Sequence, residues 1–228
     1  MTYLAKVGEL TLKGSNLAEF EHQLVVNARS CLKGHAVTVT LHAGRLYIDC
    51  DENAAKDVEF TLAHLIGITG WAHAAVTEKN IDAISAAVYE EAVRAKQAGA
   101  STFKVECRRG DKSFPLDSYG ICCASASRAS DEGLLTVDVH NPDVVINVEV
   151  RERCFVFTDS HKGCRGLPVG CSGKGLLMLS GGLDSPVAGY RMIRRGMKIE
   201  CVYYHSYPYT SEEAQKKVED LAAVLADY

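Results

Sequence analysis

The sequence has no run of about 18 apolar residues, the length that a membrane-spanning helix needs, and no secretory signal at its start. It also has no Cys-x-x-Cys pair, although nine cysteines are present. Cys122 and Cys123 are adjacent and Cys164 and Cys171 are far apart, a spacing that does not suit a structural zinc site. We therefore expect a cytoplasmic protein without membrane association, whose thiols stay reduced.

A strong excess of charge of one sign is also absent. The 25 basic and 29 acidic residues give a net charge of −4, which indicates neither a surface that is basic overall and binds nucleic acid nor an acidic tail. A site for a polyanion must therefore be local. With 228 residues, of which 47% are hydrophobic and 24% charged, the composition excludes a disordered or collagen-like chain and allows one or two globular domains.

The first 75 residues predict the element order β-α-β-β-α-β. Strand-like runs lie at residues 3–7, 37–41, 45–50 and 68–75, and amphipathic helical stretches at 16–34 and 53–66. This order is typical of a ferredoxin-like α+β domain, in which two split βαβ units share one antiparallel sheet.

Residues 76–165 predict a second small α/β unit. Its clearest element is a helix that is capped by Asn80 and ends at Gly99. A strand at 102–107, a loop at 108–116 and a weaker helical stretch at 117–130 follow, and three more strands are expected at 134–139, 144–150 and 154–158.

The third segment begins after a glycine-rich connection. Residues 162–175 contain five glycines and one proline, so we place a linker at 166–175. Residues 176–228 then alternate strand, helix, strand and helix, which is the start of a parallel α/β sheet of the kind that binds nucleotides.

The strongest chemical signal is the run Ser180-Gly181-Gly182-Leu183-Asp184-Ser185-Pro186, between a buried strand and a helix. The two glycines permit positive φ and inward-facing amides, and the serines add hydroxyl donors. We expect Ser185 to be the N-cap and Pro186 the first helical residue, which would aim the helix dipole at the same point. Because Asp184 would repel phosphates unless a cation lay between them, we infer a magnesium-bridged pyrophosphate site.

A plain strand-turn-helix connection with a serine cap would also explain Gly-Gly and Ser-Pro, but it gives no reason for Ser180 and Asp184. The upstream run Gly170-Cys171-Ser172-Gly173-Lys174-Gly175 does not fit the other common phosphate loop. Pro168 stands at the first glycine position of that pattern and Gly175 at its hydroxyl position.

Residues 180–185 resemble the SGGxDS pyrophosphatase loop (PP-loop) of the ATP-pyrophosphatases. Further motifs narrow the resemblance to the tRNA 4-thiouridine synthase family, the tRNA sulfurtransferases also linked to thiamine biosynthesis (ThiI). These motifs are Gly8-Glu9-Leu10-Thr11-Leu12-Lys13-Gly14, Arg108-Arg109 with residues 111–115, Gly166-Leu167-Pro168-Val169-Gly170 and Pro208-Tyr209-Thr210-Ser211. The sequence departs from the family at Arg165, usually glycine, and at Gly120, usually acidic.

The resemblance implies three domains in order and extends beyond Tyr228 in the family. It implies a ferredoxin-like domain at 1–75, an RNA-binding THUMP domain at 76–165 whose family alignment starts near 60, and an incomplete PP-loop domain (adenine nucleotide alpha hydrolase-like) at 176–228. ATP contacts map onto Met178, Leu179, Ser180, Gly181, Gly182, Asp184, Ser185, Tyr203 and Tyr204, with Asp184 also catalytic and the Mg²⁺ ligand. From the residues alone, Met178, Leu179, Tyr203 and Tyr204 also fit ordinary buried strand ends.

The implied reaction is adenylation of uridine 8 of tRNA at O4, followed by delivery of sulfur from a cysteine persulfide. The implied partners are tRNA, a cysteine desulfurase or other persulfide donor, the ThiS sulfur carrier and a second copy in a homodimer. The family's persulfide cysteine lies beyond residue 228, so we assign no nucleophile among the nine cysteines. We expect Cys122, Cys123 and Cys201 to be small buried residues, and the linker thiols Cys164 and Cys171 to be exposed.

A local basic cluster provides the expected RNA contact. Lys104, Arg108, Arg109 and Lys112 lie within nine residues, with Lys13 and the group of Lys162, Arg165 and Lys174 as extensions. Solvated surface charge, balanced by Glu106 and Asp111, is the alternative interpretation. Phe114 would stack on a base or, beside Pro115, pack internally.

Two other functions stay open at this point. One is a non-catalytic tRNA-binding module formed by the first two domains, and the other is an ATP-pyrophosphatase that acts on a small molecule. The second leaves the RNA-type domains unexplained.

Overall fold

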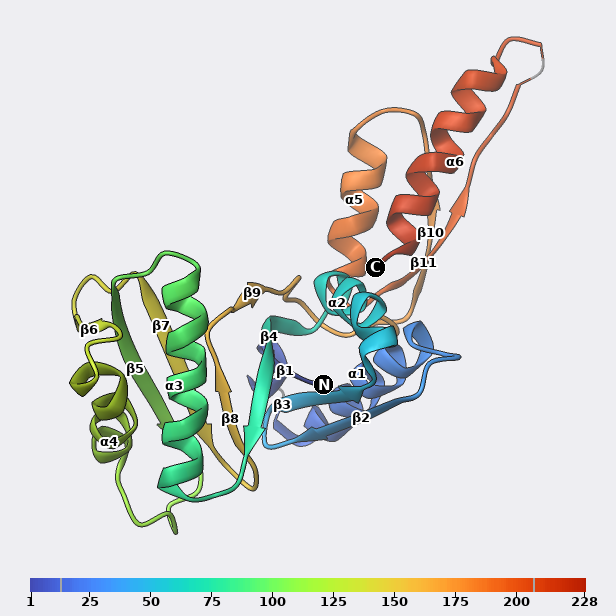
Figure 1. The fold of residues 1–228 in the computed structure, drawn as a ribbon. Coiled ribbons are helices and arrows are strands. Elements are labelled where there is room, and N and C mark those ends of the chain that lie inside the picture. The colour runs from blue at the N-terminus through green and yellow to red at the C-terminus, as the bar shows by residue number, and fades with distance from the viewer. Residues whose placement is uncertain (13, 207) are drawn as a thin grey trace. The chain divides into compact units, whose positions relative to one another are not determined.

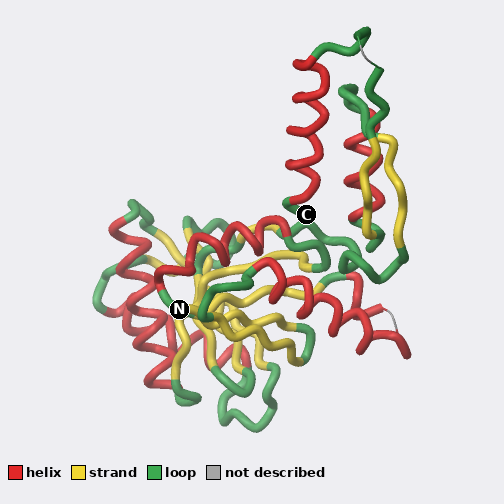
Figure 2. Tube along the Cα trace, turned by 90° about the vertical axis from the view of Figure 1, so that its right-hand side faces the viewer, coloured by secondary structure: helices red, strands yellow, loops and turns green. Residues whose placement is uncertain are grey.

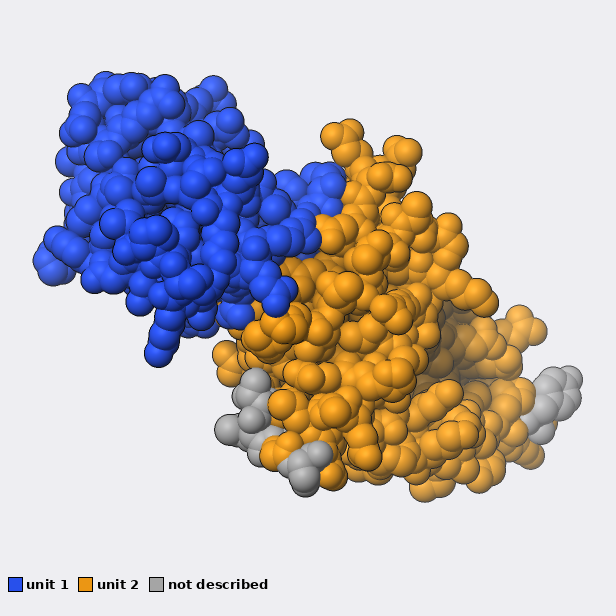
Figure 3. Space-filling view, turned by 90° about the horizontal axis from the view of Figure 1, so that it is seen from below, with its two compact units in different colours: residues 1–3, 72–160 blue, residues 4–71, 161–228 orange. Residues whose placement is uncertain are grey.

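The computed structural model describes residues 1–12, 14–206 and 208–228, and Lys13 of the expected basic group lies outside them. The chain forms two compact units, coloured separately in Figure 3. Unit 1 comprises residues 1–3 and 72–160, and unit 2 comprises residues 4–71 and 161–228. Among the described residues, none of the helices is long and apolar enough to cross a membrane.

The N-terminal part of unit 2 has the expected ferredoxin-like topology (Figure 1). Its sheet has the order β2-β3-β1-β4, and β2 and β3 form an antiparallel hairpin. Leu24, Ile48 and Leu62 are fully buried, because the apolar faces of both helices meet the sheet. The elements are β1 (Thr2–Val7), α1 (Leu17–Cys31), β2 (Val37–His42), β3 (Arg45–Cys50), α2 (Ala55–His64) and β4 (Ile68–Thr77), with 3-10 turns at Glu9–Leu12, Gly14–Asn16 and Glu52–Ala54.

Unit 1 is a mixed sheet with the order β4-β8-β7-β5-β6, in which β5 runs parallel to β6 and β7. Its elements are α3 (Ile81–Gln97), β5 (Thr102–Arg109), α4 (Ser118–Asp131), β6 (Thr136–Val137), β7 (Val144–Val150) and β8 (Cys154–Phe157). Asn80 and Asp117 cap the two helices by accepting hydrogen bonds from Ala83 N and Gly120 N. The helices and the sheet share one core around Val88, Phe103 and Ile146.

The rest of unit 2 is a short parallel α/β segment (Figure 2). Strands β10 and β11 pair in parallel, and Leu177 and Leu179 of one sheet face join the apolar cluster of α5 and α6. Leu176 and Met178, which point to the opposite face, are 68% and 69% exposed. The elements are β9 (His161–Lys162), which pairs with β4, then β10 (Lys174–Met178), α5 (Asp184–Ile193), β11 (Lys198–Val202) and α6 (Glu212–Ala226).

The connection between β9 and β10 packs onto the ferredoxin-like part rather than running free. Arg165 exchanges backbone hydrogen bonds with Gly67 and Ile68, at 3.0 and 2.8 Å, and Leu167 N donates to Arg194 O at 3.0 Å. Arg165 has φ 59 and Gly166 has φ 84, so both lie in the left-handed region. Arg165 thus occupies a conformation that favours glycine.

Candidate functional site

Residues 180–185 connect β10 to α5 at the carboxyl ends of the two parallel strands (Figure 1). This edge is where ligands bind in open α/β sheets. Ser180, Gly182 and Asp184 are exposed, so the loop presents its polar groups to solvent. The position agrees with a phosphate-binding role.

The local geometry of this loop differs from our expectation in two ways. Helix α5 begins at Asp184 with Leu183 as its N-cap, so Ser185 is not the cap and Pro186 lies inside the first turn. Neither Gly181 nor Gly182 has φ in the left-handed region. Positive φ was therefore the wrong reason for the glycine pair. Ser185 does not cap because its hydroxyl closes the loop instead.

The two serines bond to each other across the loop. Ser180 N donates to Ser185 Oγ at 2.9 Å, and the two hydroxyl oxygens lie 3.0 Å apart. The amides of Gly181, Gly182 and Leu183 donate to no acceptor in the described residues. Three adjacent amides thus remain available to an anion at the positive end of α5.

Asp184 provides one exposed carboxylate beside these amides. In the described part of the chain it has no ion-pair or hydrogen-bond partner, and no group of three or more acidic, histidine or cysteine side chains gathers to hold a metal. Magnesium is commonly held by one or two carboxylates together with substrate phosphates rather than by an all-protein cage. The lone carboxylate fits that arrangement.

The strand-end residues that the sequence points to differ in their environments. Leu179 is buried and donates its amide to Val202 O at 2.9 Å, and Tyr203 packs against the same apolar cluster. Met178 and Tyr204 are 69% and 75% exposed. The side chains of Leu179 and Tyr203 thus contribute to packing, whereas Met178 and Tyr204 present their side chains to solvent.

Sequence reasoning missed Lys217 of α6. A Cβ built on Gly181 would lie 3.6 Å from Lys217 Cδ, so the lysine stem passes directly beside the loop. Lys217 is exposed and has no ion pair within the described residues, whereas its neighbour Lys216 pairs with Asp220 at 2.7 Å. The position of Lys217 beside the loop was not predictable from the sequence, because two lysines in a charged helix are typical of a solvated surface.

The four cations of the expected RNA cluster differ in whether they have an ion-pair or hydrogen-bond partner. Lys104 pairs with Glu106 at 2.6 Å, and Arg109 donates to Phe114 O at 3.3 Å and to Leu116 O at 3.1 Å. Arg108 and Lys112 are exposed and have no such partner in the part of the chain that the structure describes. Strand β5 also extends to Arg109, so Arg108 lies on the strand and not in a loop.

Phe114 is 5% exposed and belongs to the core of unit 1. Of the two expectations for Phe114, internal packing beside Pro115 is confirmed, and stacking on a base is wrong. The loop around it is held in place by several bonds: Asp111 pairs with Lys79 and accepts from Ser113 N at 2.8 Å, and Gly110 N donates to Val150 O at 2.7 Å. Arg109 acts with these groups to support the loop.

Burial disfavours the thiolate form of several of the cysteines. Cys123 and Cys201 are exposed, which corrects the expectation that they are buried, while Cys122 and Cys164 are partly buried. Burial raises the pKa of Cys107 to about 12, and it also raises the pKa of the Cys122, Cys164 and Cys201 thiols. A raised pKa keeps these thiols protonated near neutral pH, which makes them poor nucleophiles.

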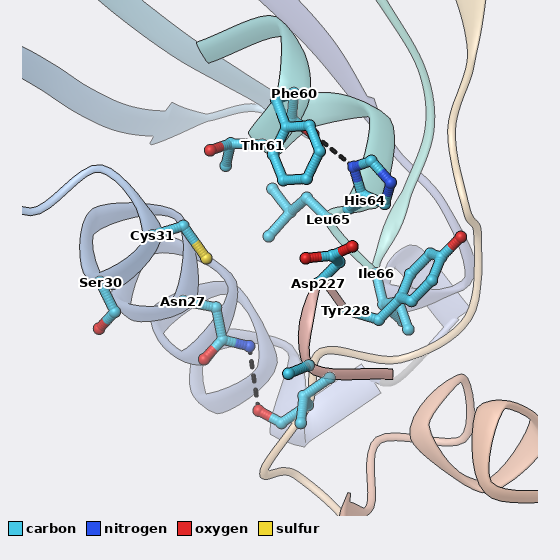
Figure 4. Close-up of a pocket in the computed structure, with 12 residues that line it drawn as sticks. Asn27, Ser30, Cys31, Phe60, Thr61, His64, Leu65, Ile66, Asp227 and Tyr228 are labelled. Carbon is cyan, nitrogen blue, oxygen red and sulfur yellow. Dashed lines mark hydrogen bonds between the residues drawn. The ribbon is translucent and has the colours of Figure 1, made fainter. Parts of the chain in front are cut away.

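A cavity of about 380 Å³ lies between α1, α2 and the end of α6 (Figure 4). The Phe60 and His64 rings lie 4.2 Å apart, and the Tyr228 ring meets His64 edge-on at 5.1 Å. Asn27 donates to Val169 O at 3.0 Å along its other wall. The lining is mainly aromatic and aliphatic, so this cavity is part of the packing between the two segments of unit 2.

Three family models match the chain in sequence order. The ThiI ferredoxin-like domain matches residues 2–72, the THUMP domain residues 78–159, and the thiamine biosynthesis protein (ThiI) family residues 170–228. Together they cover almost the whole chain.

The curated relatives that match the chain are named probable tRNA sulfurtransferases. A probable tRNA sulfurtransferase of Treponema pallidum (strain Nichols) is 51% identical over 99% of this chain, and one of Thermoanaerobacter sp. (strain X514) is 44% identical over 99%. The chain spans 57% and 59% of the length of these two relatives.

Two solved structures share the fold. A 4-thiouridine synthetase–RNA complex with bound ATP is 34% identical with a TM-score of 0.86, and the match covers 99% of this chain and 58% of that one. PH1313 from Pyrococcus horikoshii is 26% identical with a TM-score of 0.88, over 100% of this chain and 74% of the other.

Proposed function

We propose that this chain, which belongs to the tRNA sulfurtransferase (ThiI) family, binds tRNA and the phosphates of ATP for the replacement of a uridine oxygen by sulfur. The expected target is uridine 8, activated by adenylation at O4, and the thiamine link follows from the family. The observation that carries the proposal is the run of three amides beside Asp184 that have no acceptor among the described residues, in a chain that also matches the THUMP domain.

The proposed role of each loop residue follows from the amide, hydroxyl or carboxylate group that it offers to a ligand. The amides of Gly181, Gly182 and Leu183 would bind phosphate oxygens, and the paired hydroxyls of Ser180 and Ser185 hold the loop in shape. Asp184 would hold Mg²⁺, which when bound neutralises phosphate charge and favours departure of pyrophosphate. Met178 and Tyr204 would flank the nucleoside, because both are exposed at the strand ends.

We further propose that the sulfur arrives from outside this chain, from a cysteine desulfurase or another persulfide donor, with ThiS as a further partner. The raised pKa values of the partly buried thiols support this assignment.

Release of pyrophosphate tests the function. If the chain acts as proposed, pyrophosphate should appear only when ATP and unmodified tRNA are both present. Release without RNA would indicate a small-molecule substrate and would contradict the proposal.

A tRNA-binding module without catalysis is the second candidate. It is favoured by one observation: the THUMP and ThiI ferredoxin-like domain models match residues 78–159 and 2–72, which together make up most of the chain. Tight tRNA binding without pyrophosphate release would select this function.

Replacing Lys217 with methionine should weaken binding of magnesium pyrophosphate about fivefold, or about 1 kcal/mol, because the positive charge is lost while the stem beside Gly181 is retained. Calorimetric titration at low salt measures this. Lys216→Met is the matched control, since Lys216 pairs with Asp220 instead. Equal affinities for the two variants would show that Lys217 has no contact with the phosphates.

Replacing Arg108 and Lys112 together with alanine should weaken tRNA binding and flatten its log-log salt dependence by about two. Both side chains are exposed and without partners in the described residues. Fluorescence titration over a range of salt concentrations gives the slope. The control is Lys96→Ala with Arg128→Ala, which removes the same charge from α3 and α4 of unit 1. A slope as steep as that of the wild type would place the RNA elsewhere.

A further inference from the structure

Arginines gather at the C-terminal end of α5, at the opposite end of this helix from residues 180–185 (Figure 1). Arg191, Arg194 and Arg195 line a cavity of about 370 Å³ together with Glu9, Gly166 and Met192. Arg165 precedes Gly166 and is exposed. Three guanidinium groups therefore lie around this cavity, those of Arg191, Arg194 and Arg195, which we call the α5 arginine cluster, against one carboxylate.

The contacts that these arginines make use only some of their guanidinium N–H donors. Arg195 Nη1 pairs with Glu9 Oε2 at 3.1 Å, and the Arg194 guanidinium lies 5.8 Å from the centre of the Tyr190 ring. Arg194 Nε is buried but has no hydrogen-bond partner in the described residues. Arg191 is exposed, and no ion pair is found for it in that same part of the chain. An anion in the cavity would satisfy these donors.

Stabilisation of the helix end does not account for the cluster. Cations near a helix C-terminus usually interact with its unpaired carbonyls. Here the last-turn carbonyls of Tyr190, Met192 and Ile193 already accept from backbone amides, those of Arg194 at 2.9 Å, Arg195 at 3.0 Å and Gly196 at 2.8 Å. The guanidinium groups are thus not needed to satisfy these carbonyls, and their remaining donors can bind a ligand.

We propose that the α5 arginine cluster binds the phosphodiester backbone of RNA, as a contact in unit 2 separate from Arg108 and Lys112 of unit 1. The cations are all arginines, whose planar fork matches two phosphate oxygens at once. Glu9 competes with the phosphate for Arg195 and so limits the affinity. This inference rests on the proposed function, because it takes RNA as the ligand.

The test compares tRNA binding by three variants of the whole chain. Arg191→Ala with Arg195→Ala should weaken binding about tenfold near 0.1 M salt and flatten the salt slope by about two. Lys33→Ala with Lys56→Ala removes the same charge from exposed positions of unit 2 and should change little. Glu9→Gln should strengthen binding about threefold, because it releases Arg195.

The opposite signs distinguish lost contacts from lost folding, since a misfolded variant does not bind more tightly. ATP binding by the double arginine variant should be unchanged, and a loss confined to ATP would assign the cluster to the nucleotide and overturn the inference. A salt slope equal to that of the wild type would also overturn it while leaving the proposed function intact. If the wild-type chain itself does not bind tRNA, the proposed function fails first.

Discussion

Asparagine at position 184 should abolish the magnesium dependence of ATP binding. The wild-type chain should bind ATP at least about tenfold more tightly with Mg²⁺ than with a chelator, whereas Asp184→Asn should show one affinity in both conditions. The reason is that Asp184 is an exposed carboxylate beside three amides without an acceptor in the described part of the chain, and an amide side chain is a much weaker magnesium ligand. Calorimetric titration with and without Mg²⁺ measures both affinities.

Glu212→Gln is the matched control for this experiment. Glu212 also lies in the first turn of a neighbouring helix, α6, and is also exposed, so both variants remove one negative charge from a helix start. The control should keep its magnesium dependence. If Asp184→Asn keeps it too, the carboxylate does not hold the ion, and the enzymatic proposal loses its metal ligand.

Alanine at position 166 should destabilise unit 2 by about 3 kcal/mol, of which about 1 kcal/mol is left-handed backbone strain and the rest steric overlap. Gly166 has φ +84, and a Cβ there would lie 2.2 Å from Arg194 O and 3.2 Å from Ile66 Cγ2. The carbonyl cannot move aside easily, because it accepts the hydrogen bond from Leu167 N.

Urea unfolding followed by tryptophan fluorescence measures this effect. The single tryptophan, Trp71, is 8% exposed and belongs to unit 2, so its emission reports on that unit. Gly173→Ala is the control, because Gly173 has φ +80 but open space around its Cβ, and it should cost only about 1 kcal/mol. Equal unfolding midpoints for the two variants would mean that the linker shifts to admit the methyl group.

The elements of the fold were predictable because each carries its own local signal. Asn80 and Asp117 cap helices as residues of their type do, and the alternation of buried residues along β5 follows from strand geometry. The expected strand at 134–139 shrinks to Thr136–Val137, because β6 is a short edge that pairs with the start of β5.

The details of the sites depended on contacts that a linear pattern does not contain. Whether Ser185 caps α5 or bonds to Ser180 depends on the path of the loop, and whether Arg109 faces solvent depends on the carbonyls of Phe114 and Leu116. Lys217 lies 36 residues from Gly181 in sequence, so only the tertiary fold brings it there. The departure at Arg165, by contrast, was visible in the sequence and coincides with a left-handed residue.

Unit 2 is assembled from two segments that are separated in the chain by about 90 residues of unit 1. At the usual speed of translation of about 5–20 residues per second, the ribosome needs on the order of ten seconds to make the intervening stretch. Until then the nascent ferredoxin-like part lacks the partners that finally cover Ile66, which are Leu179, Ile193, Val218 and Leu225. Ile66 therefore stays uncovered while the ribosome makes unit 1, whose own core around Val88, Phe103 and Ile146 is complete before the second segment of unit 2 is made.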